Sequence, residues 1–461
     1  MATKRKRKAR RRQFPTVNAN AAGVDIGSRE IWGSVPEGRD TPRTRKFQAY
    51  TGDLYNLANW LLACRVQTVA MESTGVYWIP LYNILEERGL EVLLTNARDV
   101  KNVSGRKTDV LDCEWIQQLH TFGLLRPSFR PELSIRVLRT YSRQRETLIR
   151  AASDHVNRMQ KTLAEMNLLL QNVISDITGL TGRKILQAIL DGERSPVALA
   201  QLKHPRIRST KAEIARALEG DYREELLFVL GQELAAYDFL QQQIAACDAA
   251  ICQQLQTLRV PWDDPLPELS KHRSRKKHGT NAPPDETREW LYQILGVDIT
   301  AVPAIGPTVG LVWIAEAGSD MTPWKSEKHF GAWLNLAPNP RITGGRRLRS
   351  PPKKNKNRLA HILKIAAQSL YRSNTALGAN FRRLRARLGP QRAIKAMAYK
   401  LAKILYLMIR NGTPFREIGG EDYEQRFQNR TLKNLKRRAK DLGFQLVPIQ
   451  QDTAKLAEDV S

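Results

Sequence analysis

The spacing of apolar residues changes once along this chain, near residue 128, and the change limits the folds open to it. Before that point, short runs with strand character alternate with helix-like stretches. After it, apolar residues recur three or four positions apart as far as about residue 258. The second spacing is typical of amphipathic helices, whose side chains three and four apart share one face. An α/β domain followed by a helical region is therefore predicted.

The order of the predicted elements narrows the fold further. Three early strands precede a helix, a strand, a helix, a strand and a last helix that Thr108 can cap. This order favours a mixed sheet whose first three strands pair as a meander, as in a ribonuclease-H-like layer. The predicted strands are Ala22 to Ile26, Ile31 to Val35, Arg45 to Ala49, Thr68 to Met71 and Glu91 to Leu94, and the helices are Leu54 to Ala63, Ile79 to Glu87 and Thr108 to about His120.

The helical region contains two long amphipathic stretches. One runs from Leu148 to Leu170, and the other keeps a 3,4 spacing over more than four heptads from Leu227 to Leu258. The second stretch predicts a coiled coil, with an ordinary bundle helix as the alternative. Its seam includes Asp248, which needs a basic or hydrogen-bonding partner if it is buried. We expect a homodimer, although the two stretches can also pair with each other as an antiparallel hairpin.

Charge and composition exclude several classes of protein. Lys and Arg number 74 against 46 acids, a net charge of +28, which favours a polyanionic partner. At 42% hydrophobic the chain can fold, and no apolar run approaches the roughly 18 residues that a membrane span needs. The four cysteines lack zinc-ligand spacing, and the basic N-terminus is followed by no apolar signal core. We therefore expect no membrane partner and a cytoplasmic location.

Changes in composition divide the chain into six predicted parts. The region 290–420 includes a stretch from Glu327 to Glu417 that holds 21 Lys and Arg and no acid between those two residues. A solvated surface usually mixes both signs, so this stretch favours nucleic-acid binding. The parts are a basic disordered arm at 1–17, an α/β domain at 18–128, a helical coiled-coil region with an insertion at 129–258, a linker at 259–289, a mainly helical region at 290–420 and a tail at 421–461.

Four carboxylates are predicted to converge in the α/β domain. Asp25 and Glu72 end two predicted strands, and Asp109 and Asp112 are three apart on one face of a predicted helix. Clustered carboxylates need a cation, and oxygen ligands suit Mg²⁺ or Mn²⁺. Two such ions about 4 Å apart promote phosphodiester displacement. Taken singly, each acid has a plain structural alternative, such as a turn cap or a favourable interaction with a helix dipole. The basic residues just upstream can hold the phosphates; they are Lys101, Arg106 and Lys107.

These residues carry a resemblance to a known family. Asp25 after a strand, Glu72-Ser73-Thr74-Gly75 and Lys107-Thr108-Asp109-Val110-Leu111-Asp112 resemble the DEDD signature of the transposases of insertion sequence family 110, whose first domain is similar to the RuvC resolvase. Later segments resemble that family's C-terminal transposase domain, which binds DNA and carries a hydroxyl nucleophile. These are Ala301 to Thr308, Trp333 to Pro338 and Ile342 to Gly345 with the basic helix that follows.

The resemblance implies DNA recombination at a mobile insertion element in a prokaryotic cell, with the protein at the nucleoid. It further implies a covalent hydroxyl–DNA intermediate, a structured guide RNA and a homo-oligomer assembled on DNA. The family's serine nucleophile precedes a glycine pair, and this chain has Thr343 there, with Ser350 in the same basic loop as the fallback. A covalent step conserves the phosphoester bond, so rejoining needs no nucleotide cofactor.

Further residues are predicted to bind nucleic acid in the C-terminal region. Gly306 and its neighbours resemble one turn of a helix-hairpin-helix, with a plain helix–helix turn as the alternative. Cations are expected around the nucleophile because its transition state is stabilised electrostatically. The predicted residues around Thr343 are Arg341, Gly344, Gly345, Arg346, Arg347 and Arg349, and a second stripe comprises Arg382, Arg383, Arg385 and Arg387.

Three functions are therefore considered. The first is a transposase in which the acids hold metal and Thr343 forms the DNA adduct. The second is a metal-dependent, RuvC-like, structure-selective nuclease with water as the nucleophile. The third is a non-catalytic nucleic-acid-binding scaffold, which predicts that Asp25→Asn changes nothing beyond binding. The complete set of acids argues against the third.

Overall fold

The computed structural model describes residues 15–73, 75–96, 109–260, 265–268, 281–338, 341–348 and 357–447. The chain divides into two compact units, Met1–Arg130 and Pro131–Ser461. Across the described residues, every helix is too short or too polar to span a lipid bilayer.

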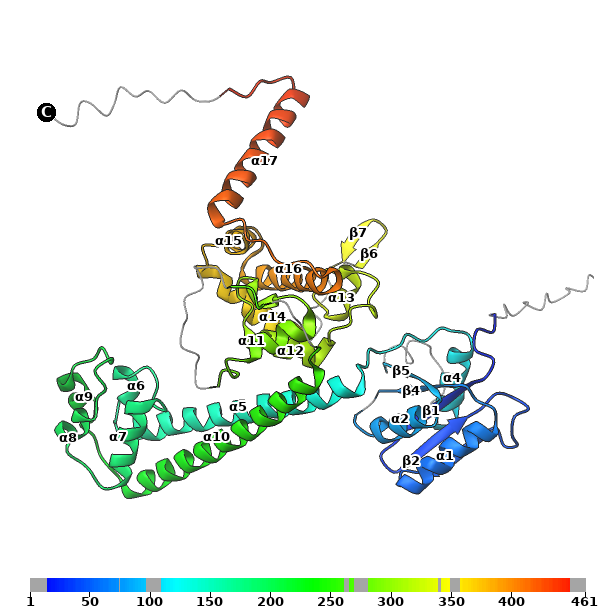
Figure 1. Ribbon diagram of the computed structural model, residues 1–461, viewed down its shortest axis with the longest axis horizontal. Coiled ribbons are helices and arrows are strands. Elements are labelled where there is room, and N and C mark those ends of the chain that lie inside the picture. Colours follow the sequence, from blue (N-terminus) through cyan, green and yellow to red (C-terminus); the bar gives the residue numbers. More distant parts are fainter. Residues whose placement is uncertain are drawn as a thin grey trace, which may run out of the picture. The chain divides into compact units, whose positions relative to one another are not determined.

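The first unit is built on a five-stranded mixed sheet in the order β3-β2-β1-β4-β5 (Figure 1). The strands β1, β2 and β3 form an antiparallel meander, and β4 and β5 extend the sheet in parallel with β1. This is the mixed sheet and meander that the sequence predicts, and it is consistent with a ribonuclease-H-like domain. The strands are β1 (Ala21–Ile26), β2 (Glu30–Ser34), β3 (Thr44–Gln48), β4 (Thr68–Glu72) and β5 (Glu91–Thr95).

Helices cover both faces of this sheet. Ala22, Val24, Val69 and Met71 alternate along β1 and β4 and pack into the core formed with α1 (Thr51–Ala63) and α2 (Trp78–Glu87). The residues between them face the other side, where Ala70 packs against α4 (Asp109–Thr121). The central strands are therefore buried on both sides, and polar side chains on them are confined to the strand ends.

The second unit begins with two long helices that run side by side in opposite directions (Figure 1). They are α5 (Leu133–Glu165) and α10 (Glu224–Leu258). Their apolar seams meet each other, because Met159 and Leu163 of α5 share a core with Leu230 and Leu234 of α10. Short helices between them extend the same core; these are α6 (Leu170–Val173), α7 (Leu180–Leu190), α8 (Pro196–Gln201) and α9 (Lys211–Ala217).

The polar seam position Asp248 has the basic partner that the sequence requires. Arg145 of α5 is buried and donates from Nε to Asp248 Oδ1 at 2.5 Å. Two turns earlier in the seam, Gln241 has a buried Nε2 atom with no hydrogen-bond partner among the described residues. The seam is thus filled within one chain by the antiparallel hairpin that the sequence left open, so it no longer supplies a reason for a dimer. The dimer itself stays a prediction.

The rest of the second unit is mainly helical and packs around aromatic residues. Phe330 is fully buried and lies against Trp313, Trp324 and Tyr406 with ring centroids 4.9–5.6 Å apart. Its elements are α11 (Thr287–Leu295), η1 (Ile299–Ala301), α12 (Pro307–Ala317), α13 (Glu327–Trp333), β6 (Arg341–Thr343), β7 (Arg346–Leu348), α14 (Arg358–Ser369), η2 (Leu370–Arg372), α15 (Ala376–Leu388), α16 (Pro390–Asn411) and α17 (Gly420–Asp441).

The segment expected to be a tail from residue 421 begins with α17, a helix of 22 residues. A helix is predicted from the regular spacing of its apolar residues. In α17 charged residues are so frequent that this spacing is not visible, and none of the residues of the helix is buried. Most of the N-terminal arm, and the chain beyond residue 447, lie outside the described residues.

Candidate catalytic site

Two of the predicted carboxylates lie at or next to the ends of neighbouring parallel strands. Asp25 follows Val24 in β1, Glu72 follows Met71 in β4, and Val24 and Met71 are paired across the two strands. Continuing that register by one residue places Asp25 beside Glu72 on the same face of the sheet. Both residues are half-buried. The register of the sheet therefore places these two acids side by side.

The face that carries Asp25 and Glu72 is the face covered by α4. Gly23 lies two residues before Asp25, and a Cβ added to it would lie 2.3 Å from the backbone nitrogen of Gln117 and 2.4 Å from the carbonyl oxygen of Cys113. Only glycine allows α4 to approach β1 this closely. The negative charge of Asp25 adds to burial in raising the pKa of the Cys113 thiol to about 12, so Asp25 lies within electrostatic reach of α4.

The direction of α4 decides which of its residues approach the acids. Gln117 donates from Nε2 to the carbonyl oxygen of Ala21 at 3.2 Å, and His120 Nε2 lies 2.9 Å from Thr68 Oγ1. The end of α4 therefore meets the start of β1 and β4, so the helix runs antiparallel to both strands. Four residues toward the start of α4 cover about 6 Å, and two residues toward the end of β1 or β4 cover about the same distance. The first turn of α4 consequently lies beside the strand ends.

That first turn holds the other two predicted acids. Asp109 is the first residue of α4 and Asp112 is half-buried one turn later, next to the fully buried Cys113. Among the described side chains, no group of three or more His, Cys, Asp or Glu is close enough to hold a metal ion. The side chain of Asp109 lies outside the described residues, as do Lys101, Arg106 and Lys107. Carboxylate oxygens from two strand ends and a helix start are nevertheless the donor set that Mg²⁺ or Mn²⁺ prefers.

Polar contacts hold α4 against the sheet at its far end and near its middle. His120 is 2% exposed, and burial lowers the pKa of its imidazole to about 4, so the ring is neutral at pH 7. Glu114, half-buried near the middle of the helix, accepts hydrogen bonds from Arg43, with which it also forms an ion pair, and from Thr44 of β3. These contacts fix α4 along the sheet and so fix the position of its first turn.

Thr343 lies in the second unit, at the tip of a two-stranded hairpin. It ends β6, pairs with Arg346 of β7, and is joined to it by Gly344 and Gly345. Both glycines have positive φ, +55° and +75°, which is the geometry of a type I′ turn. Directly paired residues place their side chains on the same side of a hairpin, so the exposed Arg346 is the cation beside the exposed Thr343.

The structure gives backbone positions for two further arginines of this site. Arg341 and Arg347 lie in β6 and β7, while Arg349 and the fallback nucleophile Ser350 lie outside the described residues. A glycine turn could be read from the sequence, but the strands on either side could not, since each is only three residues long.

Gly306 stands at the start of α12, as its motif predicts. It is the N-cap residue, followed by Pro307 at the first helical position. Ala304, which replaces the first glycine of the helix-hairpin-helix pattern, has φ +70°. A left-handed backbone at a residue with a Cβ is unusual, so the turn keeps its glycine-like geometry despite the substitution.

The four arginines of α15 have different surroundings. Arg383 pairs with Glu424 and stacks on Phe427 of α17, and Arg382 donates to the carbonyl oxygens of Tyr371 and Ser373. Arg385 lies over the ring of Tyr371. Arg382, Arg385 and Arg387 are exposed. Arg383 therefore has a structural partner, and the other three remain accessible to a phosphate.

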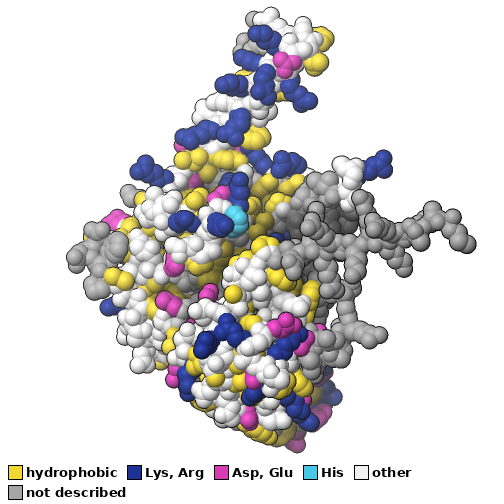
Figure 2. Space-filling view, turned by 90° about the vertical axis from the view of Figure 1, so that its right-hand side faces the viewer, with side chains coloured by type: hydrophobic (Ala, Val, Ile, Leu, Met, Phe, Trp, Pro, Cys, Tyr) yellow, Lys and Arg dark blue, Asp and Glu magenta, His cyan; other side chains and the backbone are white. Residues whose placement is uncertain are grey.

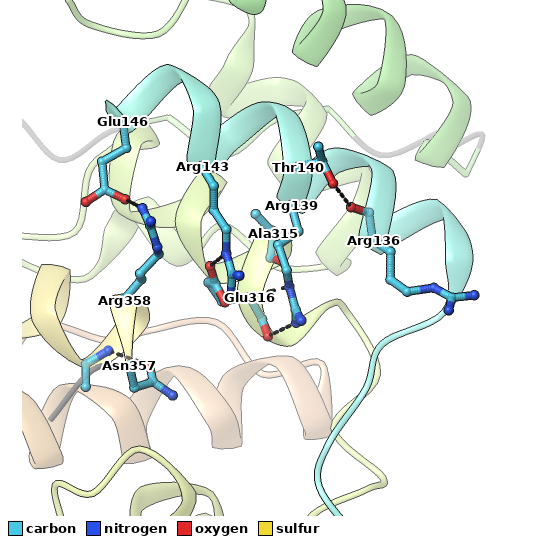
Figure 3. Close-up of polar contacts among 10 residues, drawn as sticks. Arg136, Arg139, Thr140, Arg143, Glu146, Ala315, Glu316, Asn357 and Arg358 are labelled. Carbon is cyan, nitrogen blue, oxygen red and sulfur yellow. Dashed lines mark hydrogen bonds and ion pairs between the residues drawn. The ribbon is translucent and has the colours of Figure 1, made fainter. Parts of the chain in front are cut away.

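Sequence reasoning missed a polar joint between α5 and the C-terminal helices (Figure 3). Glu316 is buried at the end of α12 and accepts two hydrogen bonds from Arg143, at 2.9 and 2.8 Å. Arg139 donates to the carbonyl oxygens of Ala315 and Glu316; burial lowers its pKa to about 10, and Glu316 opposes that shift.

The same joint reaches α14. Glu146, one turn beyond Arg143 on α5, pairs with Arg358, the first residue of α14 (Figure 3). The sequence does carry a signal for this joint. Glu316 is a lone acid at the end of the apolar run from Val309 to Ala315, and the arginines of α5 are three and four residues apart. The contacts link the helix that follows the Thr343 hairpin to the long helix α5, so the base of the hairpin region is tied to a rigid element.

Two protein-family models match the chain. One describes the DEDD transposase of IS110 elements and matches residues 22–168, and the other describes the transposase IS116/IS110/IS902 family and matches residues 298–382. No curated protein matches the chain. The first match contains the sheet with its acids and the second contains Gly306 and Thr343, so the chain is a transposase.

More specifically, the chain belongs to the IS110 family of transposases of insertion elements. The resemblance seen in the sequence is thereby confirmed. The DEDD domain implies that a divalent metal ion is used. Helix α17 begins beyond the last matched residue.

Proposed function

We propose that this transposase cuts and rejoins DNA with a metal site formed by Asp25, Glu72, Asp109 and Asp112 and with Thr343 as the nucleophile. The observation that carries the proposal is the antiparallel packing of α4 on β1 and β4, which brings its acidic first turn to the strand ends that hold Asp25 and Glu72. Repulsion among carboxylates this close is relieved by bound cations.

The acids supply the ligands for Mg²⁺ or Mn²⁺. When bound, such ions polarise the scissile phosphate and stabilise the charge on the leaving oxygen. The protein contributes fixed positions: strand ends hold Asp25 and Glu72, and the close contact at Gly23 holds the start of α4. The basic segment before α4, with Lys101, Arg106 and Lys107, binds the neighbouring phosphates.

The hydroxyl of Thr343 attacks the phosphorus of the DNA backbone. The bond from Oγ1 to phosphorus forms while the bond from phosphorus to the leaving deoxyribose oxygen breaks; the hydroxyl loses its proton and the leaving oxygen gains one. A hydroxyl of a second strand then attacks the same phosphorus and releases Thr343. The number of phosphoester bonds is unchanged, so no nucleotide cofactor is consumed. Arg346 beside Thr343 stabilises the charged transition state.

Two partners belong to the proposal through family membership. A structured guide RNA directs the choice of DNA, and several copies of the chain assemble on it. The stretch without acids between Glu327 and Glu417 supports contact with nucleic acid, and most of its described cations are exposed or half-buried.

The proposal is tested by incubating the full chain with element-end DNA, guide RNA and Mg²⁺ and mapping any peptide linked to a nucleotide by mass spectrometry. A nucleotide on Thr343 is expected. Thr343→Ala should lose the adduct and strand joining, while Thr343→Ser, which keeps the hydroxyl and removes the methyl group, should retain both. Asp25→Asn should lose both while still binding DNA.

One observation favours a second candidate, a metal-dependent nuclease with water as the nucleophile. Thr343 is β-branched, and its methyl group restricts the rotamer that an in-line attack needs. This candidate predicts that Thr343→Ala still cleaves DNA and that no adduct forms. Cleavage that survives in Asp25→Asn as well would contradict both candidates, whereas DNA binding without cleavage by the wild type would leave a binding scaffold.

A further inference from the structure

Helix α17 carries a basic stripe that the function above does not use. Between Gln425 and Asp441 the chain has seven Lys and Arg and no acid. Five of them follow one another at spacings of four, three, four and three residues, which places them on one face of the helix. This α17 stripe comprises Arg426, Arg430, Lys433, Arg437 and Lys440. Figure 2 shows the dark blue side chains gathered over α17 at the top of the view.

The cations of the α17 stripe have no counter-charge within the described residues. All five are exposed, and none takes part in an ion pair or side-chain hydrogen bond there. The acids of α17 lie at its two ends, and Glu424 is already paired with Arg383 of α15. The stripe is therefore an unbalanced positive surface.

Within the described part of the chain, the side-chain contacts of α17 with the rest of its unit lie at the start of the helix. The hydroxyl of Tyr423 accepts a hydrogen bond from Asn380 at 2.5 Å, and Arg383 stacks on the ring of Phe427. Beyond Phe427 every described residue of the helix except Ala439 is exposed. Like charges four apart destabilise an isolated helix by a few tenths of a kcal/mol per pair, so an unattached basic stripe is a net cost to the free protein.

The length of the stripe matches a nucleic-acid backbone. Arg426 to Lys440 spans fourteen residue steps, about 21 Å at 1.5 Å per residue. Phosphates of one strand of a duplex follow each other every 3.4 Å along the axis, so about six fall within that length. Five cations opposite about six phosphates is a close match in charge and in size.

We propose that the α17 stripe binds the phosphate backbone of the DNA duplex on which the C-terminal unit acts. A second copy of α17 is a poor occupant for this face, because it would bring ten like charges together. DNA is favoured because α17 is anchored on α15, whose Arg382, Arg385 and Arg387 are exposed and continue the basic surface. The proposal rests on the proposed function only in taking DNA as the substrate.

The test is the salt dependence of binding of a DNA duplex to the full chain carrying Thr343→Ala, which removes the proposed nucleophile. Each phosphate contact contributes about −0.9 to the slope of log K against log salt. Glutamine at all five positions of the α17 stripe should therefore reduce the magnitude of the slope by roughly 4 to 5. An unchanged slope would overturn the proposal. Loss of duplex binding by every form of the chain, wild type included, would instead contradict the proposed function.

Three matched variants make the result specific. Glutamine at five exposed cations of the hairpin and its cap removes the same charge and should change the slope by less than about 1; these are Arg158, Lys161, Lys184, Lys211 and Arg216. Leu432→Gln with Leu435→Gln alters the opposite face of α17 and should leave the slope unchanged. Lysine at Arg426, Arg430 and Arg437 keeps the charge and should keep the slope.

Two outcomes would count against the proposal. If the hairpin variant lowers the slope as much as the α17 variant, the effect is one of net charge and the proposal fails. If an RNA duplex of the same length shows the change and the DNA duplex does not, the stripe binds RNA and the assignment to DNA is wrong. Circular dichroism of the α17 variant should show no loss of helix, because removing like charges reduces repulsion.

Discussion

Asp25 and Glu72 end strands that are covered by helices on both faces, whereas Thr343 stands at the tip of a hairpin of two three-residue strands. Around the carboxylates, the approach of α4 to Gly23 leaves no room even for a methyl group. Around the hairpin turn, a Cβ added to Gly344 or Gly345 would meet no atom of the described residues within 4 Å. The proposed metal ligands and the proposed nucleophile thus stand on scaffolds of opposite rigidity.

This difference matches what each group has to do. Metal ligands must keep their spacing before DNA arrives, and a productive geometry tolerates errors of only about 0.5 Å. A nucleophile on an isolated hairpin has few contacts of its own, because two strands alone are marginally stable. In the proposed function, its position is therefore set by the DNA that it attacks, and Arg346 beside it binds the phosphate.

The rigid half of this comparison is tested most strongly by Gly23→Ala. The added methyl group would lie within 2.8 Å of three backbone atoms of α4, so the helix must move away from the sheet. We expect the first unit to lose roughly 3 kcal/mol or more of unfolding free energy, an extreme case of overpacking. Metal-dependent cleavage should be lost with it, and urea unfolding followed by hydrogen exchange in α4 measures the change.

Gly52→Ala is the control for this variant. Gly52 lies in the first turn of α1 in the same unit, and a Cβ there would meet nothing within 4 Å. Alanine favours helix over glycine, so this variant should be unchanged or slightly more stable. Equal behaviour of the two variants would show that the contact at Gly23 does not hold α4 in place.

The sheet was predictable because each strand can be recognised from the pattern of its own residues. The alternation along β1 and β4 places Ala22 and Val24 on one face and Gly23 and Asp25 on the other, and the sequence alone predicted the strands to within a residue or two at each end. The acids at the ends of parallel neighbours then had to meet. The closeness of α4 was not predictable, because the atoms facing Gly23 belong to Gln117, far along the chain.

The residues and the turn of the C-terminal site could be predicted from the sequence, but its hairpin could not. The order Thr343-Gly344-Gly345 predicted a turn, but a two-stranded hairpin also needs pairing between Arg341 and Leu348, which no periodicity reveals over three residues. The joint between Arg143 and Glu316 could not be predicted from the sequence, for another reason. It links residues 173 positions apart, and a single sequence holds no record of such a contact.

A pH-dependent test addresses the other end of the rigid unit. Burial lowers the pKa of His120 to about 4, against about 6.5 in the unfolded chain, so between these values the unfolded state binds a proton that the folded state does not. Stability should therefore fall as the pH falls from about 6.5 to 4, by up to roughly 3 kcal/mol. Denaturant midpoints of the first unit, followed across this pH range, measure the loss.

His120→Gln separates this group from the carboxylates that also titrate in acid. The glutamine keeps a polar partner for Thr68 but has no proton to gain in this range. The variant should be less stable than the wild type at pH 7 and should lose less further stability between pH 6.5 and 4. If the variant shows the same pH dependence as the wild type, the loss of stability in acid comes from other titrating groups. His120 is then not the group that holds this end of α4.

The smallest effect is expected at the exposed hairpin, from Gly345→Ala. The residue has φ +75°, which costs an alanine about 1 kcal/mol. Because no described residue packs on the turn, the cost should appear as adduct formation slowed about fivefold, with the thermal unfolding of the chain unchanged. Gly345→Asn, which tolerates a left-handed backbone better, should slow the reaction less. A large loss of global stability in either variant would show that the hairpin is packed like the metal site, and the contrast between the two scaffolds would no longer hold.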